Sequence, residues 1–194
     1  MRRRTFDALA TAAGLVMVAV LLVAGILLAW GHSFVTSEVH NQLAAEKIYF
    51  PAANSAAVKA PEFAAMRQYG GQLMTTGAQA EVYADHFIAN HLKVIGGGKT
   101  YAQLSAASLA QPKNAALAGQ VQTVFRGETL RGLLLNAYAF GKIATIMGIA
   151  AIAAFAGAAL MLILSAMGFV HERRTTPETE VFPKLTSPAE ASAR

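Results

Sequence analysis

Two long stretches of the sequence carry no charged side chain. Residues 8–31 form a run of 24 such positions, and residues 143–170 form a second run of 28. Because the hydrocarbon layer of a bilayer is about 30 Å thick and a helix rises about 1.5 Å per residue, each run is long enough to cross it. Backbone groups inside lipid must be hydrogen-bonded within their own segment, so both runs are predicted to be helices.

The composition supports this interpretation. Hydrophobic residues make up 55% of the chain and charged residues 14%, with a mean hydropathy of +0.41. An ordinary soluble domain has a charged share of about 25%. The sequence therefore indicates an integral membrane protein and excludes an ordinary soluble domain.

A secretory signal peptide is the alternative interpretation of the first run, since Arg2, Arg3 and Arg4 precede it. The apolar part of a signal peptide is about 7 to 15 residues long and ends in a small-residue cleavage site. This run is longer and closes with Leu28, Ala29 and Trp30. We therefore expect an uncleaved membrane anchor.

The positions of lysine and arginine predict the orientation, because these side chains resist translocation. Three arginines precede the first run, Arg173 and Arg174 follow the second, and Lys47 is the only cation in the sixteen residues after the first run. The prediction is a multi-pass protein of the plasma membrane with both termini in the cytoplasm. Its segments are a basic cytoplasmic N-terminus (1–7), transmembrane helix 1 (8–31), an extracytoplasmic helical domain (32–142), transmembrane helix 2 (143–170) and a disordered cytoplasmic tail (171–194).

The predicted fold is an all-α membrane protein, a two-helix transmembrane hairpin whose long helices extend into the small outer domain. The first helix is expected to continue toward residue 48, and the second to begin as far out as residue 115. Between them, the spacing of apolar residues predicts short helices at 62–73, 79–95 and 100–110. His91 lies on the apolar stripe of the second of these and is expected to be a core histidine. The chain has no cysteine, so this domain must fold without disulfides.

The net charge of +5 does not indicate nucleic-acid binding. Residues 2–7 carry +2 of this charge, and this basic N-terminus suits the cytoplasmic face and its anionic lipid. Membrane lipid is therefore an expected partner. Gly98, Lys99 and Thr100 resemble the end of a phosphate-binding loop, but the required glycine five positions before Gly98 is Lys93. A glycine helix stop followed by a threonine cap is the preferred interpretation, and no cofactor is predicted.

The most distinctive charged cluster lies between residues 126 and 142. Glu128 and Arg131 are one helical turn apart and are expected to pair. Arg126 and Lys142 are candidates to contact lipid phosphates or an acidic partner, or else belong to a solvated, self-paired face. Residues 133–140 either begin the second span early, with Lys142 snorkelling, or pack against the extension of the first helix; we expect the packing, with Asn136 bonding across helices. The candidate partner or lipid contacts are Arg126, Glu128, Arg131, Asn136, Tyr138 and Lys142.

A weaker alternative is a metal or proton-relay site at Asp85, His86 and His91. The two histidines are five positions apart, about 140° around a helix, whereas shared metal sites prefer positions i and i+4. Neither apolar run contains an ionisable group, which argues against autonomous transport. Small residues fill both runs and permit either pairing of the two spans or contact with another protein. They are Ala10, Gly14, Ala19 and Ala24 in the first, and Gly148, Ala150, Ala151, Ala153, Ala154, Ala156, Gly157, Ala158 and Ala159 in the second.

The sequence of residues 125–140, FRGETLRGLLLNAYAF, resembles an uncharacterised family of small actinobacterial membrane proteins with two spans. Residues 75–80 and 83–88 carry the same resemblance, which covers nearly the whole chain except the tail. Some members bear an automatic label of aromatic ring-opening dioxygenase. Such enzymes require a preformed cluster of metal ligands, for which this sequence offers Asp85, His86 and His91.

Three functions are therefore expected in order of preference. The first is a non-enzymatic accessory or scaffold subunit of a membrane complex, with a membrane-protein partner or a second copy as its contact. The second is an extracytoplasmic ligand sensor. The third is a metal-dependent enzyme of the cell envelope that uses Asp85, His86 and His91.

Overall fold

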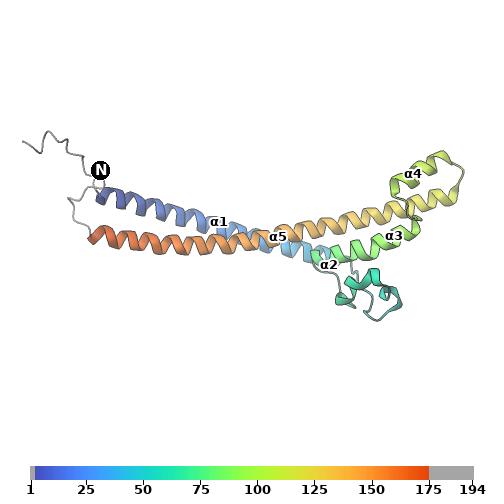
Figure 1. Cartoon of the computed structure of the whole chain (residues 1–194), viewed down its shortest axis with the longest axis horizontal. Helices are drawn as coiled ribbons and strands as arrows, with labels where there is room; N and C mark the ends of the chain where they lie inside the picture. Colours follow the sequence, from blue (N-terminus) through green and yellow to red (C-terminus); the bar gives the residue numbers. More distant parts are fainter. Residues whose placement is uncertain (1–2, 175–194) are drawn as a thin grey trace, which may run out of the picture. The chain divides into compact units, whose positions relative to one another are not determined.

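A computed structural model describes residues 3–174, with side chains from Thr5 onward. Within them the chain is helical apart from its connecting segments and one antiparallel bridge between Tyr49 and Leu73. This confirms the predicted all-α class. Figure 1 shows the elements in chain order: α1 (Arg3–Ala45), the 3-10 helices η1 (Ala56–Val58) and η2 (Pro61–Tyr69), α2 (Gly77–Val82), the π-helix η3 (Tyr83–Ile88), α3 (Ala89–Ile95), α4 (Tyr101–Ala110) and α5 (Ala115–Arg174).

Two of these helices, α1 and α5, are long and apolar enough to cross a membrane. Only 17% and 11% of their most apolar windows are buried, whereas the core helix of a soluble protein is mostly buried. Exposed side chains such as Val16, Leu27 and Ile152 leave the outer faces of these helices apolar. The two long apolar helices that the sequence predicts are confirmed.

The described chain divides into two compact units. The first unit comprises residues 3–29 and 148–174, and the second comprises Trp30–Met147. Both α1 and α5 contribute residues to each unit, because neither helix is interrupted where the division falls.

In the first unit, α1 and α5 pack through a narrow seam of small residues. The buried positions alternate at spacings of three and four, which is the 3.5-residue repeat of a left-handed helix pair. A Cβ added to Gly25 would lie 2.8 Å from Cε1 of Phe155, and one added to Gly168 would lie 2.9 Å from Oγ1 of Thr11. The glycines therefore permit close approach. The seam consists of Gly14, Val18, Gly25, Ala151, Ala154, Ala158 and Ser165.

This seam shows which of the predicted small residues pair the two helices within the first unit. Gly14, Ala151, Ala154 and Ala158 are buried in it, whereas Ala19 is exposed. The exposed small residues, such as Ala19, do not take part in this seam.

In the second unit, α1 ends at Ala45, earlier than the predicted end near residue 48. Lys47 has a left-handed backbone with φ of 54°, which turns the chain out of the helix. The next residues form backbone hydrogen bonds with a distant segment: Phe50 N–H donates to Gln72 O at 2.9 Å, and Met74 N–H donates to Ile48 O at 2.9 Å. These bonds replace the last turn of helix that the sequence predicts.

The core of the second unit is a cluster of buried side chains from α1, the segment that follows it, the short helices and α5. Its largest completely buried side chains are Val58, Met66 and Met74, each with no exposed surface. Leu43 of α1 and Leu134 of α5 belong to the same cluster, so both long helices help to enclose it. Leu134 shares this cluster with Leu43, as predicted for the packing of residues 133–140 against the first helix, whereas Leu133 and Phe140 of the same segment are exposed.

The helix predicted at 62–73 is instead the 3-10 helix η2. It begins at Pro61 and is connected to η1 through Arg67, whose guanidinium donates to the carbonyl oxygens of Val58, Lys59 and Ala60 at 2.9, 2.7 and 3.0 Å. These long-range side-chain bonds, which a local pattern does not reveal, stabilise the compact turn.

The helix predicted at 79–95 is observed as α2, η3 and α3 in succession. It begins with a capping box between Thr76 and Gln79, and its middle is a π turn. A π turn contains an extra residue, so positions four apart stay on one face. Consequently Ala80, Ala84, Ile88 and Leu92 are buried while His91 is exposed. The expectation of a core histidine at this position is wrong for that reason.

The segment from residue 96 to α5 follows the prediction closely. Gly97 and Gly98 have φ of 58° and 77°, and Thr100 caps α4 by accepting from the backbone N–H of Gln103. This is the predicted glycine stop and threonine cap. Helix α5 begins at Ala115 as expected and includes residues 171–174, while the rest of the predicted disordered tail, 175–194, lies outside the described residues.

Candidate functional site

Arg131 contacts one residue from each group of candidates in the sequence: Asp85 of the possible metal site and Glu128 of the charged cluster. Its Nη2 donates to Oδ1 of Asp85 at 2.8 Å, across 46 positions of sequence, and its Nη1 lies 3.6 Å from Oε2 of Glu128. The predicted pair of Glu128 and Arg131 is confirmed. The Asp85 contact was not predicted, because nothing in the sequence indicates that the π-helix η3 lies beside α5.

The carboxylates stabilise the charged form of Arg131. The side-chain hydrogen bond from Asp85 is the largest cause that raises the pKa of Arg131, and the charges of Asp85 and Glu128 add to it. The Nε atom is buried and has no hydrogen-bond partner in the described residues. Asp85 is thus engaged by a guanidinium, which competes with any metal for its oxygens.

The two histidines next to Asp85 are held by backbone carbonyls. His86 Nδ1 donates to Glu62 O at 3.1 Å, and His91 Nδ1 donates to Phe87 O at 2.7 Å. The ring of His91 also packs against Phe87 and Phe63, with centroids 4.3 and 5.8 Å apart. Within residues 3–174 no group of three His, Cys, Asp or Glu side chains is placed to hold a metal ion.

Aromatic rings pack in a continuous stack from His91 through Phe87 and Tyr83 to Phe50, in the segment that follows α1. Tyr83 packs against Phe87 at 4.8 Å and against Phe50 at 5.5 Å, measured between ring centroids. Burial raises the pKa of Tyr83. The histidine therefore ends a structural stack that joins η2, η3 and α3. Beside it lies an open hollow of about 710 Å³ lined by Glu62, Phe63, His91 and Lys93, among others.

Four of the six predicted contact residues on α5 are exposed: Arg126, Glu128, Asn136 and Lys142. Arg126 lies open on the helix surface, and so does Asn136. The predicted hydrogen bond of Asn136 across helices is wrong: Leu134 occupies the core position, and a residue two places further on points about 200° away around the helix.

Six exposed residues along one side of α5 in the second unit are uncharged and largely apolar, and the exposed Arg126 lies at their edge. Leu133 is 61% exposed, Phe140 55% and Phe125 47%. Gly132 lies among them, and a Cβ added to it would meet nothing within 4 Å. We call this surface the open face; it consists of Phe125, Thr129, Gly132, Leu133, Asn136 and Phe140.

Tyr138 and Lys142, the remaining candidates, lie together on another face of α5. The Lys142 Nζ is 5.3 Å from the centroid of the Tyr138 ring. Both residues line a groove that also includes His32 and His40 of α1. Sequence reasoning missed these two histidines, although they follow the first apolar run directly on a helix that was expected to continue.

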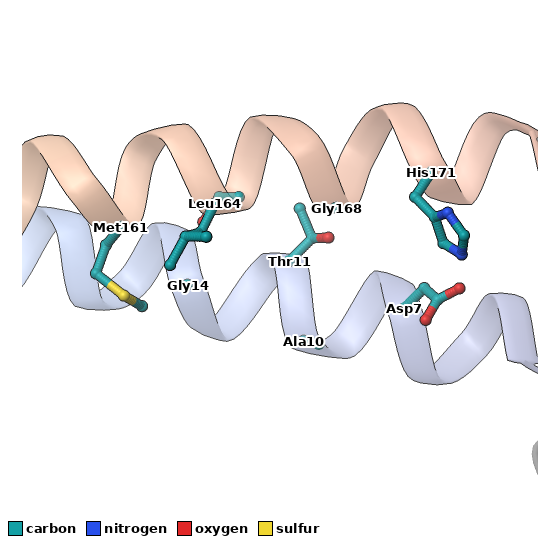
Figure 2. A pocket seen from close by; sticks show the side chains of 9 residues that line it. Asp7, Ala10, Thr11, Gly14, Met161, Leu164, Gly168 and His171 are labelled. Carbon is teal, nitrogen blue, oxygen red and sulfur yellow. The ribbon is translucent and has the colours of Figure 1, made fainter.

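A smaller hollow, of about 170 Å³, lies at the end of the seam in the first unit. Figure 2 shows Asp7 of α1 and His171 of α5 extending toward each other across it. The remaining lining is small or apolar, with Gly14, Ser165 and Gly168 on the two helices. Asp7 and His171 therefore make this end of the seam polar.

The chain was compared with protein families, curated proteins and solved structures. No family model, curated protein or solved structure matches the chain.

Proposed function

We propose that the protein is a non-enzymatic, two-span integral membrane protein that acts as an accessory or scaffold subunit of a membrane complex. In this proposal residues 32–142 lie outside the cytoplasm and both termini lie inside it. The length and the apolar outer surface of α1 and α5 support the spans. The distribution of arginine and lysine around the two runs supports the orientation.

The open face of α5 is the observation that carries the subunit role. Its six residues carry no charge and its large side chains are about half exposed or more, while the exposed Arg126 lies at its edge, two helical turns before Leu133. Such a surface in water marks a site of protein or membrane contact. Since it runs directly into Ile143 and the second apolar run, its occupant is inferred to be a helix of another membrane protein that continues alongside α5.

Gly132 indicates how closely that helix would approach. A glycine on an exposed helix surface costs about 1 kcal/mol relative to alanine and gains no packing from its own chain. Between Thr129 and Asn136 it leaves a shallow place where a second backbone fits, and the Asn136 side chain is then available to bond across the contact, whereas the Thr129 hydroxyl donates to Phe125 O at 2.9 Å. Residues 125–140 also carry the family resemblance, and membership of that two-span family is part of this proposal.

Purification in a gentle detergent followed by native mass spectrometry tests the subunit role. The wild-type protein is expected to carry one partner at a fixed ratio. Leu133→Lys and Gly132→Leu are expected to release it, whereas Leu109→Lys is expected to retain it, because Leu109 is an equally apolar, 80% exposed residue on α4. A wild-type monomer, a self-assembly, or loss of the partner in all three variants would contradict the proposal.

Single cysteines test the orientation, since the chain has none of its own. Lys99→Cys in the second unit is expected to react with a membrane-impermeant maleimide on intact cells. Thr5→Cys near the N-terminus is expected to react only after lysis. The reverse pattern would overturn the proposed topology.

The hollow beside His91 favours one alternative, a ligand sensor. Its volume of about 710 Å³ suits a small molecule, although it is open to solvent. A small molecule that copurifies with the wild-type protein, but not with a Val94→Trp variant that narrows the hollow, would support this function. Metal analysis of the same sample tests the envelope enzyme, for which a stoichiometric metal lost in His86→Gln is the required result.

A further inference from the structure

The groove that contains Tyr138 and Lys142 is built from three elements of the second unit. Helix α1 contributes His32, Thr36 and His40, and α5 contributes Tyr138 and Lys142. The start of α2, with residues 75–78, closes the remaining side. The cavity volume is about 310 Å³, which is enough for a phosphate group with part of what it is attached to.

The groove is basic. Three basic side chains line it, those of His32, His40 and Lys142, and none of the described residues that line it is acidic. No carboxylate in the described part of the chain forms an ion pair with Lys142, and its Nζ lies over the ring of Tyr138. The charge of Lys142 is therefore available to an anion.

His32 is held in one orientation by the protein. Its Nδ1 donates to the carbonyl oxygen of Ala144 at 2.7 Å, since a carbonyl oxygen can only accept. Nε2 is then the nitrogen left for a ligand. It accepts from a P–O–H group when the ring is neutral and donates to a phosphate oxygen when the ring is protonated. Both modes suit a phosphate.

The position of the groove along the chain indicates where that phosphate comes from. His32 directly follows the first apolar run, and Lys142 directly precedes the second. Trp30 is 67% exposed and stacks on Phe34 with centroids 5.6 Å apart, as expected for aromatic side chains at a membrane interface. With the runs in lipid, the groove lies at the depth of the headgroups.

We propose that this groove binds an anionic phosphate group, held by Lys142, His32 and His40 with the hydroxyl of Thr36. A lipid headgroup and free phosphate share this chemistry, and the location favours the lipid. The lipid source rests on the proposed two-span arrangement, whereas phosphate binding itself rests on the groove.

The test uses the full-length protein in a phosphate-free detergent. Native mass spectrometry compares retention of phosphatidylglycerol with that of a phosphate-free glycolipid of the same acyl chains, and calorimetry measures inorganic phosphate. Lys142→Gln is expected to weaken binding about fivefold, because one basic side chain near an anionic headgroup contributes about that factor. His40→Gln, at an exposed position, is a second groove variant with the same expected direction.

Lys99→Gln is the matched control, because Lys99 is exposed in the glycine loop and does not line the groove. Preference for phosphatidylglycerol that falls in both groove variants but not in the control supports the lipid source. Inorganic phosphate binding with that same pattern, but without lipid preference, supports the groove with a soluble ligand. Absence of both, or equal weakening in the control, overturns the proposal.

These outcomes are separate from those for the proposed function. Inorganic phosphate binding in detergent requires neither a partner protein nor a particular topology. Conversely, the partner on the open face is tested by Leu133→Lys, which leaves the groove intact because Leu133 is not among its lining residues.

Discussion

The two units bury their side chains in different ways. In the first unit, two helices meet along Gly14, Ala154 and Ala158, and the large side chains point outward. In the second unit, large side chains such as Met66 and Met74 are completely enclosed by short helices and a loop. Small residues therefore bring backbones together where lipid is the proposed surrounding, and large residues are hidden where water is.

A methionine-to-alanine change in each unit should give the largest difference between them. Met66→Ala is expected to destabilise the second unit by about 2–5 kcal/mol, because it leaves a cavity in a closed core. Met17→Ala, at a side chain that is 48% exposed, is expected to change stability by less than about 0.5 kcal/mol. Denaturant unfolding in detergent measures both, and equal losses would break the comparison.

Two glycines provide a second contrast. A Cβ on Gly77 would lie 2.8 Å from the carbonyl oxygen of Ala137, which is backbone and cannot move aside easily. Gly77→Ala is therefore expected to cost about 1–3 kcal/mol. A Cβ on Gly157, next to the seam residue Ala158, would lie 3.4 Å from Cδ1 of Leu21, an ordinary contact. Gly157→Ala is expected to leave the melting temperature unchanged or raise it, and a loss there comparable to that of Gly77→Ala would contradict this prediction.

The Asp85–Arg131 pair is expected to contribute less to the stability of the second unit than these packing contacts. The two side chains are 41% and 33% exposed, so water screens the interaction, and Asp85→Asn is expected to cost at most about 1 kcal/mol. A double-mutant cycle with Arg131→Gln isolates the coupling. Glu128→Gln is the control, with a weaker effect expected from its 3.6 Å contact. A larger coupling for Glu128 than for Asp85 would show that the closer pair is not the stronger one.

The smallest expected effect concerns alkaline pH. Burial raises the pKa of Tyr83 above its ordinary value of 10.0, so folding favours its protonated form. Its contribution to stability is fully present below pH 10 and is lost as the pH rises through the raised pKa. Ultraviolet titration of the phenolate should show one tyrosine ionising late, and Tyr83→Phe should remove that component. An unchanged titration curve in the variant would show that Tyr83 is not the late group.

Several elements followed from local patterns. The two apolar helices, the start of α5 at Ala115 and the Thr100 cap are determined within a few residues of sequence, and each is observed. Glu128 and Arg131 are likewise only one helical turn apart in the sequence. The errors at His91 and Asn136 arose because the π turn and the position of Leu134 in the core depend on packing between distant segments.

The candidate sites depend even more on distant contacts. Asp85 meets Arg131 only because η3 lies beside α5, and His32 joins Lys142 only because α1 and α5 are neighbours at the start of α2. A local pattern records which residues share one face of one helix and does not record which helices meet.

By itself, the sequence determined the long apolar helices, because hydrophobicity over 24 and 28 positions and the absence of charge are properties of the chain alone. Only the tertiary structure decided which small residues form the seam, which face of α5 stays open and which cations share a groove. Those outcomes depend on the rotation and register of helices against one another, which side-chain packing selects after the helices have formed.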